Sequence, residues 1–111
     1  MADVLGGFEQ AVLLAVVRLR DAAYGRAILK EVQVRLDRDV AAGAVHATLE
    51  RLEQKGLLSS RLGAGTPIRA GRPRRYYQLQ PAGVRALNNA RAAVETLWHG
   101  LHWPLPGRGR A

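Results

Sequence analysis

The side chains best suited to chemistry in this sequence are arginines, and they are concentrated in one part of the chain. Residues 54–94 hold eight basic side chains and no acidic one, whereas residues 1–53 hold seven basic and eight acidic ones. The planar guanidinium group of arginine suits the oxygens of a phosphate. A basic segment beside a nearly neutral one predicts a protein that docks one face on phosphate groups. The alternative is a basic surface kept for solubility.

Groups that could carry out catalysis are scarce. The chain has no Cys, so it offers no thiol nucleophile, no disulfide and no Cys-ligated zinc site. His99 and His102 are three residues apart but have no neighbouring side chains that would complete a set of metal ligands. The Ser59-Ser60 pair has no evident general base. The sequence therefore predicts a protein that is not an enzyme and that holds no metal ion and no cofactor.

A helix is predicted at residues 42–55, directly before the basic segment. Val45, Leu49 and Leu52 recur at the spacing of one helix face, and Gly56 stands where a helix stop belongs. The opposite face carries small residues, which would let the backbone approach a surface such as the major groove of DNA. Arg51 on that face is the best candidate for reading guanine or anchoring a phosphate, with an ion pair to an acid as the alternative.

Two strands are predicted after this helix, at residues 57–62 and 75–79, and Gly and Pro crowd the connection between them. This pattern indicates a β-hairpin with a long basic tip, whose arginines would contact the DNA backbone or the adjacent minor groove. The residues expected to contact DNA are Ala44, His46, Ala47, Thr48, Arg51, Arg69, Arg72, Arg74 and Arg75.

Further helices are predicted at residues 8–19, 25–36 and 81–101. Apolar side chains nearly encircle the first of them, and the last carries a seam with alternating spacings of three and four that only Arg91 interrupts. Both patterns predict a second subunit, although the last helix could instead fold back on its own domain. The residues expected at the dimer interface are Phe8, Val12, Val84, Leu87, Val94, Trp98 and Leu101.

Tyr24 directly precedes Gly25 at the start of the second helix and has two interpretations. In the first, its ring fills the edge of the core. In the second, it contacts a DNA phosphate.

Several separated motifs extend this pattern, namely Tyr24-Gly25, Leu49-x-x-Leu52-Glu53-x-x-Gly56-Leu57, Gly71-Arg72-x-Arg74-x-Tyr76-Tyr77-x-Leu79 and Gly83-x-x-x-Leu87. Over residues 8–101 the chain resembles the PadR family of winged helix-turn-helix transcriptional regulators. Three positions depart from the family pattern: His46 stands for an aromatic residue, Ala41 for a Ser and Gln80 for a Thr.

The resemblance implies a dimeric repressor that binds a palindromic DNA operator. It also implies that residues 37–42 supply a very short strand beside the hairpin. Similar proteins have dimer or interdomain hollows that admit small aromatic molecules. Trp98 is placed to line such a hollow, so a small aromatic effector is expected as a further partner.

The expected fold class is α+β, mainly α: a winged helix-turn-helix over residues 1–80, an added C-terminal dimerisation helix over 81–101 and a disordered tail over 102–111. No apolar run approaches the roughly 20 residues that span a bilayer, and the N-terminus lacks the basic start of a signal peptide. We therefore expect a cytoplasmic bacterial protein that associates with the nucleoid when it binds DNA. We expect no association with a membrane. The alternatives are a winged helix that binds structured RNA and an adaptor whose basic hairpin meets an acidic protein.

Overall fold

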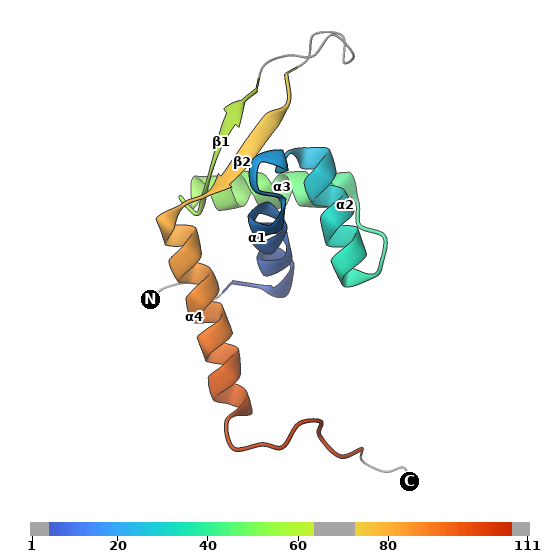
Figure 1. The fold of residues 1–111 in the computed structure, drawn as a ribbon, viewed down its shortest axis with the longest axis vertical. Coiled ribbons are helices and arrows are strands. Elements are labelled where there is room, and N and C mark those ends of the chain that lie inside the picture. Colours follow the sequence, from blue (N-terminus) through green and yellow to red (C-terminus); the bar gives the residue numbers. More distant parts are fainter. Residues whose placement is uncertain (1–4, 64–72, 108–111) are drawn as a thin grey trace.

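The computed structural model describes residues 5–63 and 73–107 of the chain. The elements are α1 (Gly7–Leu19), a short 3-10 helix η1 (Arg20–Ala22), α2 (Gly25–Leu36), α3 (Ala42–Gln54), β1 (Leu58–Leu62), β2 (Arg75–Leu79) and α4 (Pro81–Trp98). Helices α1 to α3 form the body of the molecule, with the hairpin projecting at one end and α4 at the other (Figure 1). The fold is mainly helical with a small antiparallel sheet, so the predicted fold class is confirmed.

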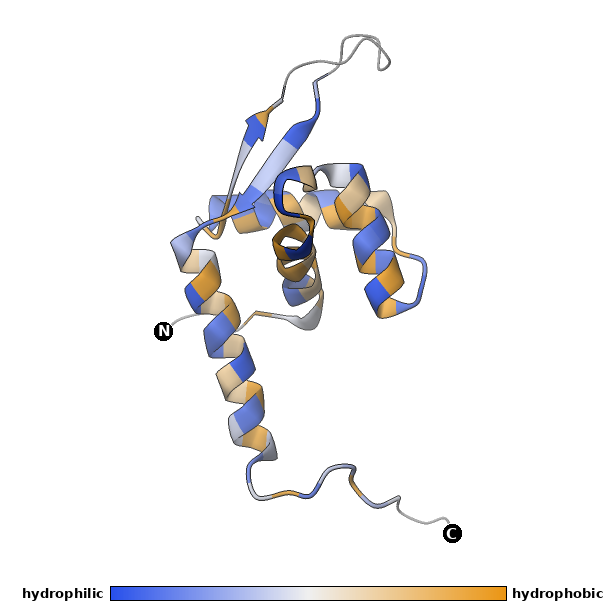
Figure 2. Ribbon diagram, viewed as in Figure 1, coloured by the Kyte–Doolittle hydropathy of each residue, from blue (hydrophilic) through white to orange (hydrophobic). Residues whose placement is uncertain are grey.

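Helix α1 lies at the centre of the core and packs against α2, α3 and β2. Most of its surface is apolar, as predicted from its sequence (Figure 2). The fully or almost fully buried apolar side chains of the three helices are Val12, Leu13, Ala15, Val16, Ile28, Val32, Val45, Leu49 and Leu52. Because each helix buries one continuous face, the opposite faces of α2 and α3 stay available for contacts outside the domain.

Strands β1 and β2 pair antiparallel, with Leu58 opposite Leu79 at the base and Leu62 opposite Arg75 toward the tip. Helix α3 leads into this hairpin through Gly56, whose φ of 78° favours glycine. The hairpin therefore starts from a fixed point at the end of α3.

The predicted short strand at residues 37–42 was wrong. Asp37 ends α2 in the left-handed conformation, and the side-chain amide of Gln33 donates a hydrogen bond of 3.1 Å to the carbonyl of Val40, which holds this segment against α2. The free edge of β2 is taken by a different segment. Tyr24 forms an isolated bridge with Tyr76, and the Tyr77 N–H donates to the Ala23 carbonyl at 2.8 Å.

Helix α4 begins at Pro81, as predicted, but ends at Trp98 rather than at Leu101. Only its first half lies against the body, where Gly83 and Ala90 are buried, and all residues from 91 to 98 are exposed. The principal extents are 59 × 34 × 20 Å and the radius of gyration is 17.0 Å, since the hairpin and α4 project from opposite ends of the body (Figure 1). A compact chain of this length would have a radius of gyration of about 13 Å.

Candidate nucleic-acid interface

The face of α3 that points away from the core is narrow, as the sequence predicts. Ala44, His46 and Ala47 are exposed, with Gly43 beside them. His46 Nε2 lies 3.5 Å from Glu50 Oε2, one turn further along the same face. Thr48, however, is only 3% exposed, so it belongs to the core side of α3 and its predicted contact to DNA was wrong.

Arg51 is exposed but already has protein partners. Its Nε donates to Glu9 Oε2 of α1 at 3.4 Å, and its Nη2 donates to Thr48 Oγ1 at 3.4 Å. Lys55 Nζ also donates to Glu9 Oε2, at 3.3 Å. The ion-pair alternative for Arg51 therefore describes the structure, with an acid that lies 42 residues away in sequence.

Glu9 is well placed to hold both cations. The Gly6 N–H donates to Glu9 Oε1 at 3.0 Å and is the main reason why the pKa of this carboxyl is lowered from its usual 4.5. Lys55 and Arg51 lower the pKa further, against the opposing effect of burial. Glu9 is therefore ionised at neutral pH, and it joins the start of α1 to the end of α3.

Two of the four predicted hairpin arginines lie in the described residues, Arg74 and Arg75, whereas Arg69 and Arg72 lie outside them. Arg75 Nη1 donates to Ser60 Oγ at 2.9 Å, and Ser60 Oγ donates in turn to Glu53 Oε2 at 2.7 Å. This chain of hydrogen bonds ties the hairpin to α3. The guanidinium carbon of Arg74 lies 4.1 Å from the ring centroid of Tyr24.

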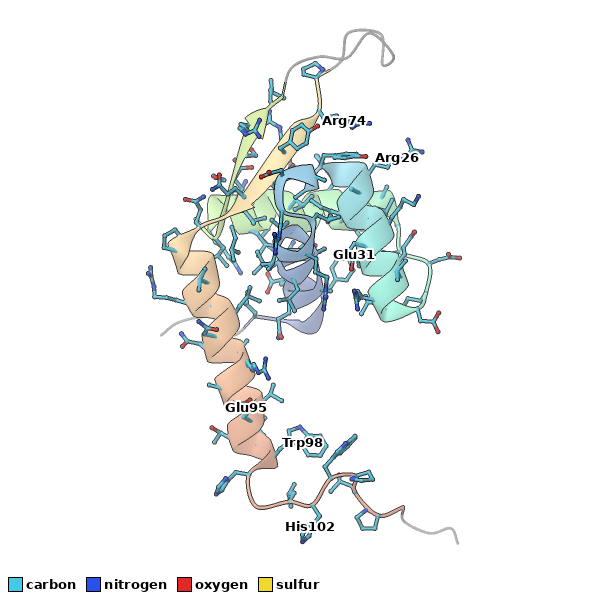
Figure 3. The ribbon with its side chains drawn as sticks, in the orientation of Figure 1. Arg26, Glu31, Arg74, Glu95, Trp98 and His102 are labelled. Carbon is cyan, nitrogen blue, oxygen red and sulfur yellow. The ribbon has the colours of Figure 1, made fainter. Side chains whose placement is uncertain are left out.

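A hollow of about 710 Å³ lies between the start of α2, the first half of α3 and the start of β2 on the tip side of the hairpin. Its apolar floor includes Leu29, Val45 and Leu49, and its cationic lining residues come from two elements and the residue before β2. These are Arg26 of α2 and Arg74 and Arg75 of the hairpin. Arg26 and Arg74 extend on the same side of the molecule (Figure 3). His46 also lines this hollow.

Sequence reasoning missed Arg26. A signal was present, because the first turn of α2 contains Arg26 and no acidic residue. The N-terminus of a helix carries the positive end of the helix dipole and normally favours an acidic side chain in the first turn. A basic side chain in that turn therefore suggests that a negatively charged partner binds beside it. The first turn of α3 likewise has no acidic residue, and neither helix has a side-chain cap. The backbone N–H groups of both helix starts are therefore not occupied by a capping side chain.

The residues predicted at a dimer interface differ in their exposure. Val84, Val94, Trp98 and Leu101 are exposed, and Phe8 and Leu87 are partly buried against the core. Val12 is fully buried within its own chain, so it has no area to offer a partner and its assignment to an interface was wrong.

A second hollow, of about 630 Å³, runs between α1 and α4, and its apolar lining includes Leu14 and Val17, which are both nearly half exposed. These two residues were missed because the all-round apolar pattern of the first helix does not reveal which side is covered by its own domain. Trp98 does not line this hollow. It is the last residue of α4 (Figure 3) and packs edge to face with Trp103 at a centroid distance of 5.1 Å.

Residues 5–63 and 73–107 form neither a metal site nor a membrane span. No three His, Asp or Glu side chains in these ranges come together as metal ligands would. In the same ranges, no helix combines the length and the apolar character needed to cross a bilayer.

The three-helix body, the hairpin and the basic side chains beside α3 define a winged helix-turn-helix protein of the DNA-binding class. Residues 13–89 match the family described as the transcriptional regulator PadR-like family, and the chain belongs to it. Transcription regulation and DNA binding are accordingly its functional class, and the predicted family resemblance is confirmed. A comparison with curated proteins found no match.

Solved structures support the same assignment. A PadR family transcriptional regulator from Eggerthella lenta DSM 2243 is 31% identical, with a TM-score of 0.64 over 81% of this chain and 76% of that chain. A PadR family transcription regulator from Clostridium difficile R20291 shares the fold at 24% identity, with a TM-score of 0.64 over 84% and 95% of the two chains. RosR from H. salinarum shares the fold at 20% identity, with a TM-score of 0.70 over 92% and 84%.

Proposed function

We propose that this protein represses transcription as a homodimer bound to a palindromic DNA operator. The observation that carries the proposal is the meeting of Arg26 from α2 and Arg74 from the hairpin at one hollow beside the exposed face of α3. In this mode the small residues of α3 enter the major groove, and the two arginines contact the backbone at its side. Ala methyl groups at positions 44 and 47 are available for thymine contact.

The dimer is supported by apolar surface that the single chain leaves uncovered. Leu14 and Val17 of α1 face the same hollow as Val84 and Val94 of α4, and all four are 43–46% exposed. Exposed apolar side chains that lie together in this way are typical of an interaction site. A twofold axis beside α4 would present two α3 helices and two hairpins to one side of a duplex. Half-sites should then lie about one helical turn, or a multiple of it, apart.

A small aromatic effector near Trp98 belongs to the same proposal. Its support is the pair of exposed indole rings of Trp98 and Trp103, which packs edge to face and can accept another flat ring.

The direct test is selection of bound fragments from random duplex DNA at a stated salt concentration, followed by affinity measurements over a range of salt. A palindromic motif is expected. Replacing Arg26 and Arg74 together by Ala removes up to four phosphate contacts from a dimer. This change should weaken binding to all duplexes and reduce the slope of log affinity against log salt by up to about 4.

The matched control is the double change Arg35→Ala with Arg38→Ala, which removes the same charge from the other end of α2 and should leave the slope unchanged. Equal affinity for A-form RNA duplexes without preference for palindromes would contradict the proposal in favour of an RNA-binding protein. Binding to DNA that never exceeds a weak non-specific level would contradict it in favour of a protein-interaction adaptor.

A further inference from the structure

Four side chains form a continuous row of contacts that joins the start of α2 to the hairpin, with two tyrosines in the middle and an arginine at each end. The Arg74 guanidinium lies over the Tyr24 ring at 4.1 Å from its centroid, and the Arg61 guanidinium lies 5.2 Å from the Tyr76 ring centroid. The two tyrosine rings meet edge to face, with centroids 5.7 Å apart and an interplanar angle of 67°.

Backbone contacts fix three of these residues, Tyr24, Tyr76 and Arg74. Tyr24 and Tyr76 form the bridge that closes the free edge of β2. The Gly63 N–H donates to the Arg74 carbonyl at 2.7 Å, so the hairpin is closed at Arg74 as well. Gly63 also leaves room for the Tyr76 ring, since a Cβ atom there would lie 2.6 Å from Tyr76 Cε1. Arg74 is therefore constrained through both its backbone and its side chain.

This constraint bears on DNA binding because Arg74 lines the same hollow as Arg26. A free arginine side chain loses much rotational freedom when it binds a phosphate, and a guanidinium already held against a ring loses less. The stacking contact leaves the edge of the planar guanidinium, with its N–H groups, open to another partner.

We propose that Tyr24 is a positioning residue for DNA binding: its ring holds the Arg74 guanidinium beside the start of α2, so that Arg74 and Arg26 meet the same stretch of DNA backbone. The inference rests on the proposed DNA-binding function and assigns a role to the Tyr24-Gly25 motif. It differs from both earlier interpretations of Tyr24, because the ring face acts on Arg74 rather than filling the core, and this role does not require the hydroxyl to contact a phosphate.

The test is a double-mutant cycle for duplex affinity with Tyr24→Leu and Arg74→Ala. Tyr24→Leu should weaken binding about 5- to 10-fold when Arg74 is present and less than about 2-fold when Arg74→Ala is already in place. Tyr24→Phe keeps the ring and is expected to keep the coupling to Arg74. Equal losses from Tyr24→Leu in both backgrounds would mean a merely structural role and would overturn the inference. Loss of the coupling in Tyr24→Phe would show that the hydroxyl matters and would also overturn it.

A measurement without DNA separates this inference from the proposed function. In the free protein, the Nε–Hε NMR signal of Arg74 should be displaced by the ring current of Tyr24, and the displacement should vanish in Tyr24→Leu and persist in Tyr24→Phe. A wild-type protein that shows the displacement but binds no DNA defeats the proposed function and, with it, the role of Tyr24 in DNA binding. An undisplaced signal in a protein that binds DNA defeats the inference alone.

If the Tyr24→Leu protein does not fold, Arg74→Lys provides a separate test of the contact between the Arg74 guanidinium and the Tyr24 ring. This change keeps the charge and removes the planar group that stacks on the ring. It should weaken duplex binding by about 5-fold or more. Unchanged affinity would overturn the inference.

Discussion

At the level of single residues, Glu9 connects two helices through one carboxylate. One oxygen accepts from the Gly6 N–H at the start of α1, and the other accepts from Arg51 and Lys55 at the end of α3. Its side chain is only 14% exposed, so these contacts are less screened than those of a surface pair. They also occupy part of the Arg51 guanidinium, which leaves fewer of its N–H groups for a contact to DNA.

The lowered pKa of Glu9 predicts how stability depends on pH. The unfolded chain binds a proton at Glu9 more readily than the folded one, so this contribution is complete above about the usual pKa of 4.5 and is lost as the pH falls through the lower folded value. Glu9→Gln should cost about 1–2 kcal/mol of unfolding free energy at pH 7. The cost should disappear in strong acid, as followed by urea unfolding across the pH range.

Glu95→Gln is the control for this experiment, because Glu95 pairs with Arg91 on the exposed part of α4. It should change the unfolding free energy little at any pH. A cost for Glu9→Gln that stays constant down to strong acid would contradict the assigned role of the charge.

At the level of elements, the direction of α4 depends on a close approach at Gly83. A Cβ atom at this position would meet the carbonyl oxygen of Leu57 and, at 2.6 Å, Leu79 Cδ1. Gly83 therefore lets the first turn of α4 lie directly on the two ends of the hairpin. The Gln80 N–H, which donates to the same Leu57 carbonyl at 2.9 Å, reinforces this junction.

Gly83→Ala should destabilise the protein although alanine is the better helix former. The gain in helix propensity is about 1 kcal/mol, whereas the clash with backbone at Leu57 requires α4 to move. We expect a net loss of about 1–3 kcal/mol, measured by thermal or urea unfolding. Gly7→Ala in α1 is the matched control, since nothing lies within 4 Å of a Cβ atom there. A Gly83→Ala protein as stable as the control would show that the junction is not tightly packed.

At the level of the whole molecule, the projection of α4 from the body lengthens the molecule and also leaves apolar side chains uncovered. The second half of α4 leaves the body, so the residues that would form its seam have no cover in the chain described over 5–63 and 73–107. The alternation of apolar and polar residues along this helix is visible in Figure 2. A partner subunit would bury this surface without any change in the fold of the single chain.

Placing a charge on this surface should therefore separate the subunits. Leu14→Glu or Val94→Glu would put a carboxylate into an apolar interface and should raise the dissociation constant of the dimer by at least about tenfold, as measured by sedimentation equilibrium. Val34→Glu is the control, because Val34 is 72% exposed on α2 and does not line the hollow between α1 and α4. A wild-type protein that sediments as a monomer at all concentrations would remove the dimer from the proposal.

The sequence by itself determined the elements and the position of the basic hairpin. The helix at 25–36 and the strand at 75–79 have the predicted bounds, and the helix predicted at 42–55 ends one residue earlier. They follow from the spacing of apolar residues and from Gly and Pro at their ends, which act within a few residues. The narrow outer face of α3 and the family followed from the same local patterns. These features depend on chemistry between near neighbours, so they can be predicted without the fold.

Only the tertiary structure decided which of these residues are available and what they contact. Thr48 turned out to be buried, Arg51 to be paired with Glu9, and Val12 to be covered by its own chain. Tyr24, rather than residues 37–42, completes the edge of β2. Each of these outcomes depends on residues that are far apart in sequence and are brought together by the packing of α1 between its neighbours. A periodic pattern identifies the faces of a helix, but what covers each face is decided by the other elements.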